Sequence, residues 1–202
     1  MRLAVTVGFD ATFVVRVLSR LGFGERLYLL YGVTGGEGDR KSADVVKWVV
    51  DAVRAGVPVA VDLRDFAAGL RQVGELDFDA VALAGGPRLL VIAAFVVGVL
   101  KGARIYAAPE YGGEVVDISS LGALVRLASL SKARMRVLSA VDGVADYRDV
   151  ARAVGVDSTT ALRHLAELEE LGLVKRVEGR SKFSVDPIVK VLAELYLQQR
   201  GA

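Results

Sequence analysis

The sequence contains no cysteine and a single histidine, His164. The absence of cysteine excludes disulfide bonds, thiolate metal ligands and cysteine nucleophiles. One imidazole per chain cannot form a histidine cluster around a metal ion, so we expect no metal site. A serine-based catalytic triad would depend on His164 as its base, and no residue of the sequence stands out as catalytic.

Neither sign of charge dominates the chain. Its 202 residues include 26 Lys and Arg against 24 Asp and Glu, which gives a formal net charge of +2. This balance excludes a protein that coats DNA or a membrane through bulk charge, although it allows a local basic patch. Hydrophobic residues make up 53% of the chain and charged residues 25%, so the composition predicts a folded protein of one domain or two small ones.

No apolar run is long enough to span a membrane. The most apolar stretch, Leu89–Leu100, has about 12 residues where a span needs roughly 20. We interpret it as a helix that is buried on most of its sides. No secretion signal follows Met1, and we therefore expect a cytoplasmic protein with no membrane partner.

Residues 1–117 alternate between short β-rich runs and amphipathic helical runs. This order predicts an α/β domain, a Rossmann-like and mostly parallel sheet with helices on both faces and right-handed crossovers. The expected strands are Arg2–Val7, Leu27–Tyr31, Val57–Val61, Ala80–Leu83, Ala103–Ala107 and Glu114–Val116. The expected helices are Phe13–Leu21, Ser42–Ala55, Asp65–Leu76 and Leu89–Leu100.

Ligands of such sheets bind at the carboxyl ends of the strands, near the point where the strand order reverses. The loops expected there are Gly8–Thr12, Gly32–Lys41, Asp62–Asp65 and Ala84–Arg88. The first of them lacks the G-x-G-x-x-G pattern of a dinucleotide-binding fold, and Tyr31 stands where that fold has an acid. A dinucleotide cofactor is therefore not expected.

Residues Gly35–Ser42 nearly spell a phosphate-binding P-loop. Arg40, however, occupies the position of the glycine that precedes the lysine of that motif, and the loop follows the second strand. We therefore disfavour ATP hydrolysis and interpret this segment as a flexible lid.

Two of the loops combine glycine with the start of a helix. Gly8 frees the backbone before the first helix, which Asp10 is expected to cap. Gly85 and Gly86 precede a helix that starts at Pro87-Arg88. Glycines at a helix start expose backbone N–H groups, and an adjacent arginine adds positive charge, so the two loops together favour a phosphorylated ligand. The alternative is that the glycines serve only the tight turns.

Beyond residue 117 the alternation of strands and helices stops. Residues 118–130 are expected to form a connecting helix and residues 131–202 a second domain. Ser131, Asp146 and Asp157 have the residue types of helix caps, and Gly155 is expected to end a helix. The expected elements are helices at 131–141, 146–154 and 157–171, a hairpin of Leu173–Val177 and Ser181–Val185, and a last helix, Pro187–Gln199, with an apolar stripe of Ile188, Val191, Leu192 and Leu195.

This order of elements is typical of a winged helix-turn-helix domain. Residues 131–186 resemble DNA-binding domains of the MarR and ArsR type, chiefly over 147–151, 155–165 and 168–174. Small hydroxyls at the start of the expected recognition helix let a phosphate approach, and Arg163 has the geometry to read a guanine edge. The candidate DNA contacts are Ser158, Thr159, Thr160, Arg163 and His164 on this helix and Lys175, Arg176, Arg180 and Lys182 on the hairpin.

Each of these candidates also has a plainer interpretation. Arg163 has Glu167 four positions further on, and the two would form a surface ion pair. His164 is either a phosphate donor or a half-buried packing residue, and the hairpin is either a DNA contact or merely solvated. Because the domain carries little net charge, its DNA affinity is expected to be modest, and a dimer would double the phosphate contacts.

Over essentially its whole length the chain is similar to the archaeal CRISPR-associated transcriptional regulators. These join a CRISPR-associated Rossmann-fold (CARF) domain to a MarR-like winged helix. The likeness is carried by Val7–Asp10, Phe13–Arg16 and Ala84–Ala93. Pro87 departs from the family pattern, which usually has another residue, often methionine, between the glycines and the arginine.

The resemblance implies a homodimer that binds a cyclic oligoadenylate, foremost the tetra-adenylate, across its twofold axis. The positions that match the ligand-binding loops are Gly8, Phe9, Asp10, Gly85, Gly86 and Arg88, and Pro87, which departs from the pattern, is a further candidate ligand contact in the same loop. A dimer also suits the apolar helix at Leu89–Leu100, since a helix that is apolar all round must be covered on all sides and a partner's helix would cover the side away from the sheet.

The sequence thus favours a dimeric transcriptional regulator of CRISPR-associated genes that binds double-stranded DNA and responds to a cyclic oligoadenylate, with no cofactor. Two alternatives stay open. One is a ring nuclease that cleaves the cyclic oligoadenylate, as some relatives in the wider CARF group do. The other is a regulator that senses a different phosphorylated metabolite.

Overall fold

A computed structural model describes residues 1–177, 179 and 181–201, and for 200 and 201 the backbone alone. The chain divides into two compact units, Met1–Ser119 and Ser120–Ala202. Most of the expected connecting segment, 118–130, therefore belongs to the second unit. Among the described residues, no helix combines the length and the apolar character needed to cross a lipid bilayer.

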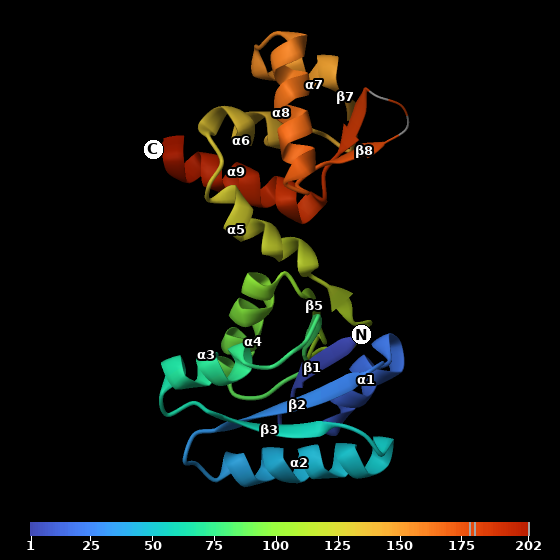
Figure 1. The fold of residues 1–202 in the computed structure, drawn as a ribbon, viewed down its shortest axis with the longest axis vertical. Coiled ribbons are helices and arrows are strands. Elements are labelled where there is room, and N and C mark those ends of the chain that lie inside the picture. The colour runs from blue at the N-terminus through green and yellow to red at the C-terminus, as the bar shows by residue number, and fades with distance from the viewer. Residues whose placement is uncertain (178, 180, 202) are drawn as a thin grey trace. The chain divides into compact units, whose positions relative to one another are not determined.

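The first unit, all of whose residues are described, is built on a six-stranded sheet in the order β3-β2-β1-β4-β5-β6 (Figure 1). Strands β1 to β5 are parallel, and β6 pairs antiparallel with β5. The predicted Rossmann-like sheet is confirmed, and its order reverses between β1 and β4. The strands are β1 (Arg2–Thr6), β2 (Arg26–Val33), β3 (Val57–Asp62), β4 (Ala80–Leu83), β5 (Arg104–Ala107) and β6 (Val116–Asp117).

Four helices cover the two faces of this sheet within residues 1–119, which are fully described. Helices α1 (Ala11–Leu21) and α2 (Gly38–Val53) pack on one face, where residues such as Val5 and Leu29 point. Helices α3 (Phe66–Gly74) and α4 (Arg88–Lys101) pack on the opposite face, where strand residues such as Ala4 and Leu30 point. Both faces are thus buried, as parallel sheets require.

Part of the glycine-rich segment after β2, which the sequence analysis interpreted as a flexible lid, belongs to helix α2. Helix α2 already begins at Gly38, and Ser42 lies buried within it. The Asp39 carboxylate accepts hydrogen bonds from the backbone N–H of Thr34 at 2.8 Å and of Gly35 at 2.7 Å. These bonds fix the loop against the first turn of α2, and the Thr34 bonds foremost lower the pKa of Asp39.

Helix α4 is buried on most of its sides, as expected, and has one exposed side of the kind that the sequence analysis assigned to a partner's helix. Its sheet-facing residues are buried, but Leu89, Ile92, Val96 and Leu100 are between 37% and 71% exposed in the single chain. These positions are three or four residues apart, so they form one stripe along the helix. The helix is apolar all round, yet one side of it has no cover within its own chain.

The second unit has the arrangement of a winged helix-turn-helix domain. The expected single helix at 118–130 is instead a short 3-10 helix, Ser119–Gly122, followed by α5 (Ala123–Leu127). The helices that follow are α6 (Lys132–Ser139), α7 (Tyr147–Val154), α8 (Ser158–Glu170) and α9 (Pro187–Gly201). Strands β7 (Val144–Asp146), β9 (Lys182–Ser184) and β8 (Lys175–Val177) form a small antiparallel sheet in this order.

The helix caps of this unit are confirmed. Ser131, Asp146 and Asp157 each accept a hydrogen bond from a backbone N–H in the first turn of the helix that follows, at 3.3, 2.9 and 2.8 Å. Gly155 ends α7 with a φ of 76°, a left-handed conformation that favours glycine. The turn between α7 and α8 is therefore set by local sequence.

Two details of this unit were not predicted. Strand β7 pairs with β9 as a third strand of the sheet. Its three residues directly precede α7 and are too few to show a strand pattern in the sequence. In α9 the expected apolar stripe is only partly buried, because Val189 and Ala193 face the core whereas Val191 and Leu195 are half exposed. The packing face of α9 is thus rotated from the predicted stripe.

Candidate ligand-binding and DNA-binding sites

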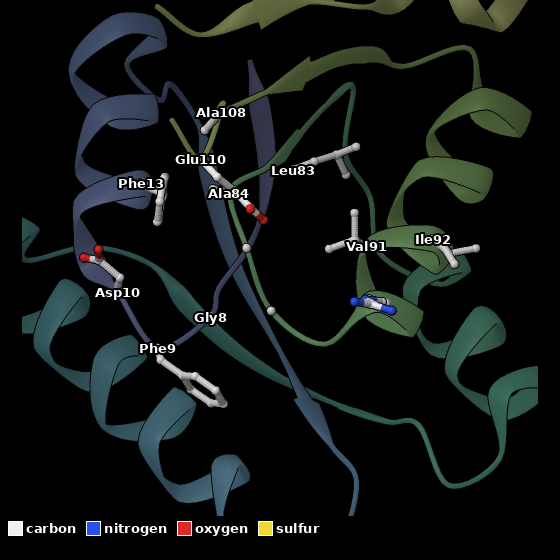
Figure 2. A pocket seen from close by; sticks show the side chains of 13 residues that line it. Gly8, Phe9, Asp10, Phe13, Leu83, Ala84, Val91, Ile92, Ala108 and Glu110 are labelled. Carbon is white, nitrogen blue, oxygen red and sulfur yellow. The ribbon is translucent and has the colours of Figure 1, made fainter. Parts of the chain in front are cut away.

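A cavity of about 690 Å³ lies at the carboxyl ends of β1 and β4, where the strand order reverses (Figure 2). Of the four loops expected at this edge, only those after β1 and β4 line it. The predicted residues that it brings together are Gly8, Phe9, Asp10, Gly85, Gly86 and Arg88. Pro87 is not among them, since its ring packs beside Gly32 of β2 instead.

The two glycine loops touch each other through their backbones. A Cβ atom on Gly8 would lie 2.7 Å from the backbone nitrogen of Gly86. A Cβ on Gly86, whose φ is +105°, would lie 2.9 Å from the carbonyl oxygen of Val7. This contact requires glycine at both positions whether or not a ligand binds nearby. The glycines therefore do not themselves indicate a ligand, whereas the cavity and its charged residues do.

Thr6, a polar residue that the sequence analysis passed over, fastens the same two loops. Its side chain is fully buried, and its Oγ1 accepts a hydrogen bond from the backbone N–H of Ala84 at 3.0 Å. The signal in the sequence was a threonine inside an otherwise apolar strand, where a buried hydroxyl needs a partner.

The two helices that start at the cavity differ in how their first turns are satisfied. The Asp10 carboxylate accepts a hydrogen bond from the backbone N–H of Thr12 at 2.8 Å, and its bonds with Thr12 lower the pKa of Asp10. Helix α4 has Pro87 at its N-cap and no side-chain cap. Its positive pole is therefore free to attract an anion.

Arg88 is the first residue of α4 and lies exposed on the cavity wall. No hydrogen bond or ion pair joins its guanidinium to another described residue. An arginine beside an uncapped helix start is the arrangement that binds phosphate groups.

Apart from Asp10 and Arg88, the cavity wall is apolar with one further carboxylate, Glu110. Phe9, which is 65% exposed, and Phe13 stand on the α1 side, while Val91 and Ile92 stand on the α4 side (Figure 2). Exposed aromatic rings offer faces on which nucleobases stack. Glu110, which the sequence analysis missed, reaches the wall from the segment after β5.

The expected recognition helix is α8, and its first turn presents two of the predicted hydroxyls. Ser158 and Thr159 are exposed, whereas the hydroxyl of Thr160 donates to the carboxylate of Asp157 at 2.6 Å. The bonds with Thr160 lower the pKa of Asp157. Two hydroxyls at this helix start are thus free for a phosphate, and the third belongs to the cap.

Arg163 is exposed on α8, and the alternative ion pair with Glu167 does not form. Glu167 is held by Arg134 of α6, with 2.7 Å between Nε and Oε2. His164 also approaches Glu167, at 3.4 Å, and its side chain is only 15% exposed. This arrangement supports the packing interpretation of His164 and leaves Arg163 pointing outward without a partner among the described residues.

The hairpin of β8 and β9 is the wing of the winged helix-turn-helix domain, and its predicted DNA contacts divide into two kinds. Lys175 and Lys182 are exposed, as a phosphate contact requires. Arg176 instead binds the Glu169 carboxylate, with Nη2 2.7 Å from Oε2, and covers the ring of the buried Phe183 at 4.6 Å from its centroid. Arg180 lies outside the described residues.

The first unit matches the family model of the Csa3 CRISPR-associated Rossmann-like domain over residues 1–119. The chain belongs to the Csa3 family. A protein of Thermoproteus tenax named as a CRISPR locus-related DNA-binding protein, Csa3, is 38% identical to it over 203 residues, and the match covers 100% of both chains. The predicted resemblance to CRISPR-associated regulators with a CARF-type domain is thereby confirmed.

The second unit of this Csa3-family chain matches the model of winged helix-turn-helix DNA-binding domains over residues 135–175. Two solved structures from Vibrio cholerae are more distant. Protein VC1899 is 12% identical with a TM-score of 0.42, covering 95% of this chain and 63% of that one. Reduced HlyU is 21% identical with a TM-score of 0.31, covering 40% and 88%. Likenesses at this level carry no argument.

The contacts of Arg176 give a prediction for this Csa3-family chain. Arg176→Ala removes the link between α8 and the wing and is expected to cost about 1 kcal/mol, which lowers the Tm of a domain of this size by about 4–8 °C. Differential scanning calorimetry of the full chain measures this. Lys175→Ala, which changes an exposed neighbour, is the matched control and leaves the Tm unchanged. An unchanged Tm for Arg176→Ala would mean that the link to Glu169 does not stabilise the domain, and Arg176 would again be a candidate DNA contact.

Proposed function

We propose that this Csa3-family chain is a homodimeric regulator that binds double-stranded DNA through α8 and the wing and controls CRISPR-associated genes. Its signal is a cyclic oligoadenylate, foremost the tetra-adenylate, bound at the cavity of the first unit. The observation that carries the proposal is the cavity itself, where Arg88, which has no hydrogen-bond or ion-pair partner among the described residues, stands at an uncapped helix start across from Phe9 and Phe13.

The cavity suits a ligand that is both anionic and aromatic. The phosphate groups would be bound by the guanidinium of Arg88 and the N–H groups that begin α4. The bases would lie against the ring of Phe9, which is 65% exposed, and beside that of Phe13, which is half-buried and has the Arg16 guanidinium over one face. A ring of several nucleotides exceeds one such half-site, so two copies of the cavity would share it.

The homodimer is supported by the uncovered stripe of α4, Leu89, Ile92, Val96 and Leu100. A second copy of the same helix would bury these side chains. Because α4 starts at the cavity, parallel pairing of the two α4 helices would bring two cavities and two copies of Arg88 together at the twofold axis. The same helix would then serve both the dimer and the ligand.

Ile92→Asp is expected to weaken the dimer by about 100-fold or more, because each copy would bury an unpaired carboxylate in the interface. Size-exclusion chromatography with light scattering over a concentration series measures this. Val15→Asp, an exposed apolar position of α1, is the control and leaves the dimer intact. A dimer that survives Ile92→Asp would contradict the assignment of α4.

The proposed ligand is tested by calorimetric titration of the purified chain with cyclic tetra-adenylate, followed by chromatography of the bound material. We expect binding and an intact ring, since the described cavity wall carries no hydroxyl, lysine or histidine side chain near the ligand. Linear products would favour the ring nuclease. No binding, with another phosphorylated compound retained in a mass spectrum of the native protein, would favour a metabolite sensor.

Ligand control of DNA binding is tested by measuring operator affinity with and without cyclic tetra-adenylate. A typical coupling is about 1–3 kcal/mol, equivalent to a change of about 5- to 150-fold. An operator affinity that does not respond to the bound ligand would remove the regulatory part of the proposal.

A further inference from the structure

Two carboxylates line the cavity, and whereas that of Asp10 accepts a hydrogen bond from the backbone N–H of Thr12, that of Glu110 stands on a wall that otherwise suits phosphate groups. Figure 2 shows Glu110 on the same side as Phe13 and Ala108, across from Val91 and Ile92 of α4. No hydrogen bond or ion pair connects its side chain with another described residue. Two oxygens with the capacity to accept hydrogen bonds therefore face the cavity unused.

The backbone before Glu110 is held at two points. The N–H of Ala108 donates to the carbonyl oxygen of Leu83 at the end of β4, at 3.0 Å. Nη1 of Arg16 donates to the carbonyl oxygen of Pro109, also at 3.0 Å. Glu110 is thus placed on the cavity wall by contacts with both β4 and α1, and is not a side chain on a free loop.

A carboxylate at this place opposes the binding of phosphates unless it meets a hydrogen-bond donor of the ligand. An ionised carboxylate accepts hydrogen bonds and donates none. The donors of an adenylate are the exocyclic amino group of the base and the hydroxyls of the ribose. Because Glu110 stands beside Phe13, and Arg88 starts the opposite wall, the base is the part of the ligand that comes to the Glu110 side.

We infer that Glu110 is a specificity-determining residue that accepts a hydrogen bond from the exocyclic amino group of an adenine in the bound ring. The inference rests on the proposed cyclic oligoadenylate ligand. It divides the cavity into a phosphate side at Arg88 and a base side at Glu110. A site that hydrogen-bonds a ligand donor rejects analogues that lack it, because its own polar group is then left unpaired.

The test combines a change in the protein with the matching change in the ligand. The wild-type chain is expected to bind cyclic tetra-adenylate about 10-fold or more tightly than the same ring built from purine riboside, which lacks the amino group. Glu110→Ala is expected to lose about the same factor on the adenylate ring and to show no further loss on the purine riboside ring. Glu110→Gln, whose amide oxygen still accepts, restores most of the preference. Calorimetric titration gives each dissociation constant.

Glu114→Gln changes another exposed carboxylate of the same segment that does not line the cavity, and it serves as the matched control. Tighter binding of every ring after both Glu110 substitutions would overturn the inference, since the carboxylate would then only repel phosphates. A loss confined to a 2′-deoxy ring would assign the donor to the ribose and overturn it as well. If the wild-type chain binds no cyclic oligoadenylate, both proposals fail, whereas binding that ignores Glu110 removes this one alone.

Discussion

Replacing Arg88 by alanine is expected to reduce the affinity for cyclic tetra-adenylate by about 100-fold or more. A hydrogen bond to a charged group contributes about 1.5–3 kcal/mol, and a twofold site would lose two such contacts. The guanidinium has no partner among the described residues, so its removal breaks nothing within the fold. Calorimetric titration measures the loss, and light scattering and DNA binding check that the unliganded chain is otherwise unchanged.

Arg20→Ala is the matched control for this experiment, because Arg20 is an exposed arginine in the last turn of α1 that does not line the cavity. It is expected to leave the ligand affinity within a factor of about two. If Arg88→Ala and the wild-type chain bound cyclic tetra-adenylate equally well, the phosphate groups would lie elsewhere. The cavity at the ends of β1 and β4 would then not be the ligand site.

Arg163→Ala is expected to weaken binding to the operator by about 30-fold or more and binding to random DNA far less. A bidentate contact with a guanine edge contributes about 1–3 kcal/mol of discrimination, and a dimer would make two such contacts. The structure supports this role, since Glu167 is occupied by Arg134 and leaves Arg163 exposed. Electrophoretic mobility shifts with operator and scrambled duplexes measure the two affinities.

Lys182→Ala provides the contrast to Arg163→Ala. Lys182 is an exposed cation of the wing, so its removal is expected to weaken binding to both duplexes about equally and to reduce the salt dependence of binding by about one ion per subunit. If Arg163→Ala behaved in the same way, Arg163 would be a phosphate contact rather than a reader of bases.

The features that the sequence predicted well depend on neighbours along the chain. A helix cap such as Asp157 satisfies N–H groups three residues away, and the alternation of apolar runs reflects the layers of a parallel sheet. The position of Gly8 and Arg88 at the cavity was likewise predictable, because each belongs to a loop-to-helix junction after a strand, where the strand order fixes the edge at which ligands bind.

The features that were missed depend on contacts between distant segments. Glu110 enters the cavity because Arg16 and β4 hold the backbone beside it, and nothing in its own sequence neighbourhood marks it. Arg176 looks like any wing cation until the carboxylate of Glu169 is seen beside it. For α4 the sequence predicted that one side would need a cover from outside the chain, but not which residues form that side.

The floor of the cavity restricts how a ligand signal travels. Thr6 bonds the backbone of Ala84, and Gly8 lies against Gly86 too closely to admit even a methyl group. If the loops after β1 and β4 separated, the buried hydroxyl of Thr6 and the backbone N–H of Ala84 would lose their hydrogen bond. The contact between the two loops is therefore expected to stay closed. We therefore expect any ligand-driven motion to move whole helices as rigid bodies while this loop contact stays in place. The helix most directly affected is α4, whose first turn carries Arg88.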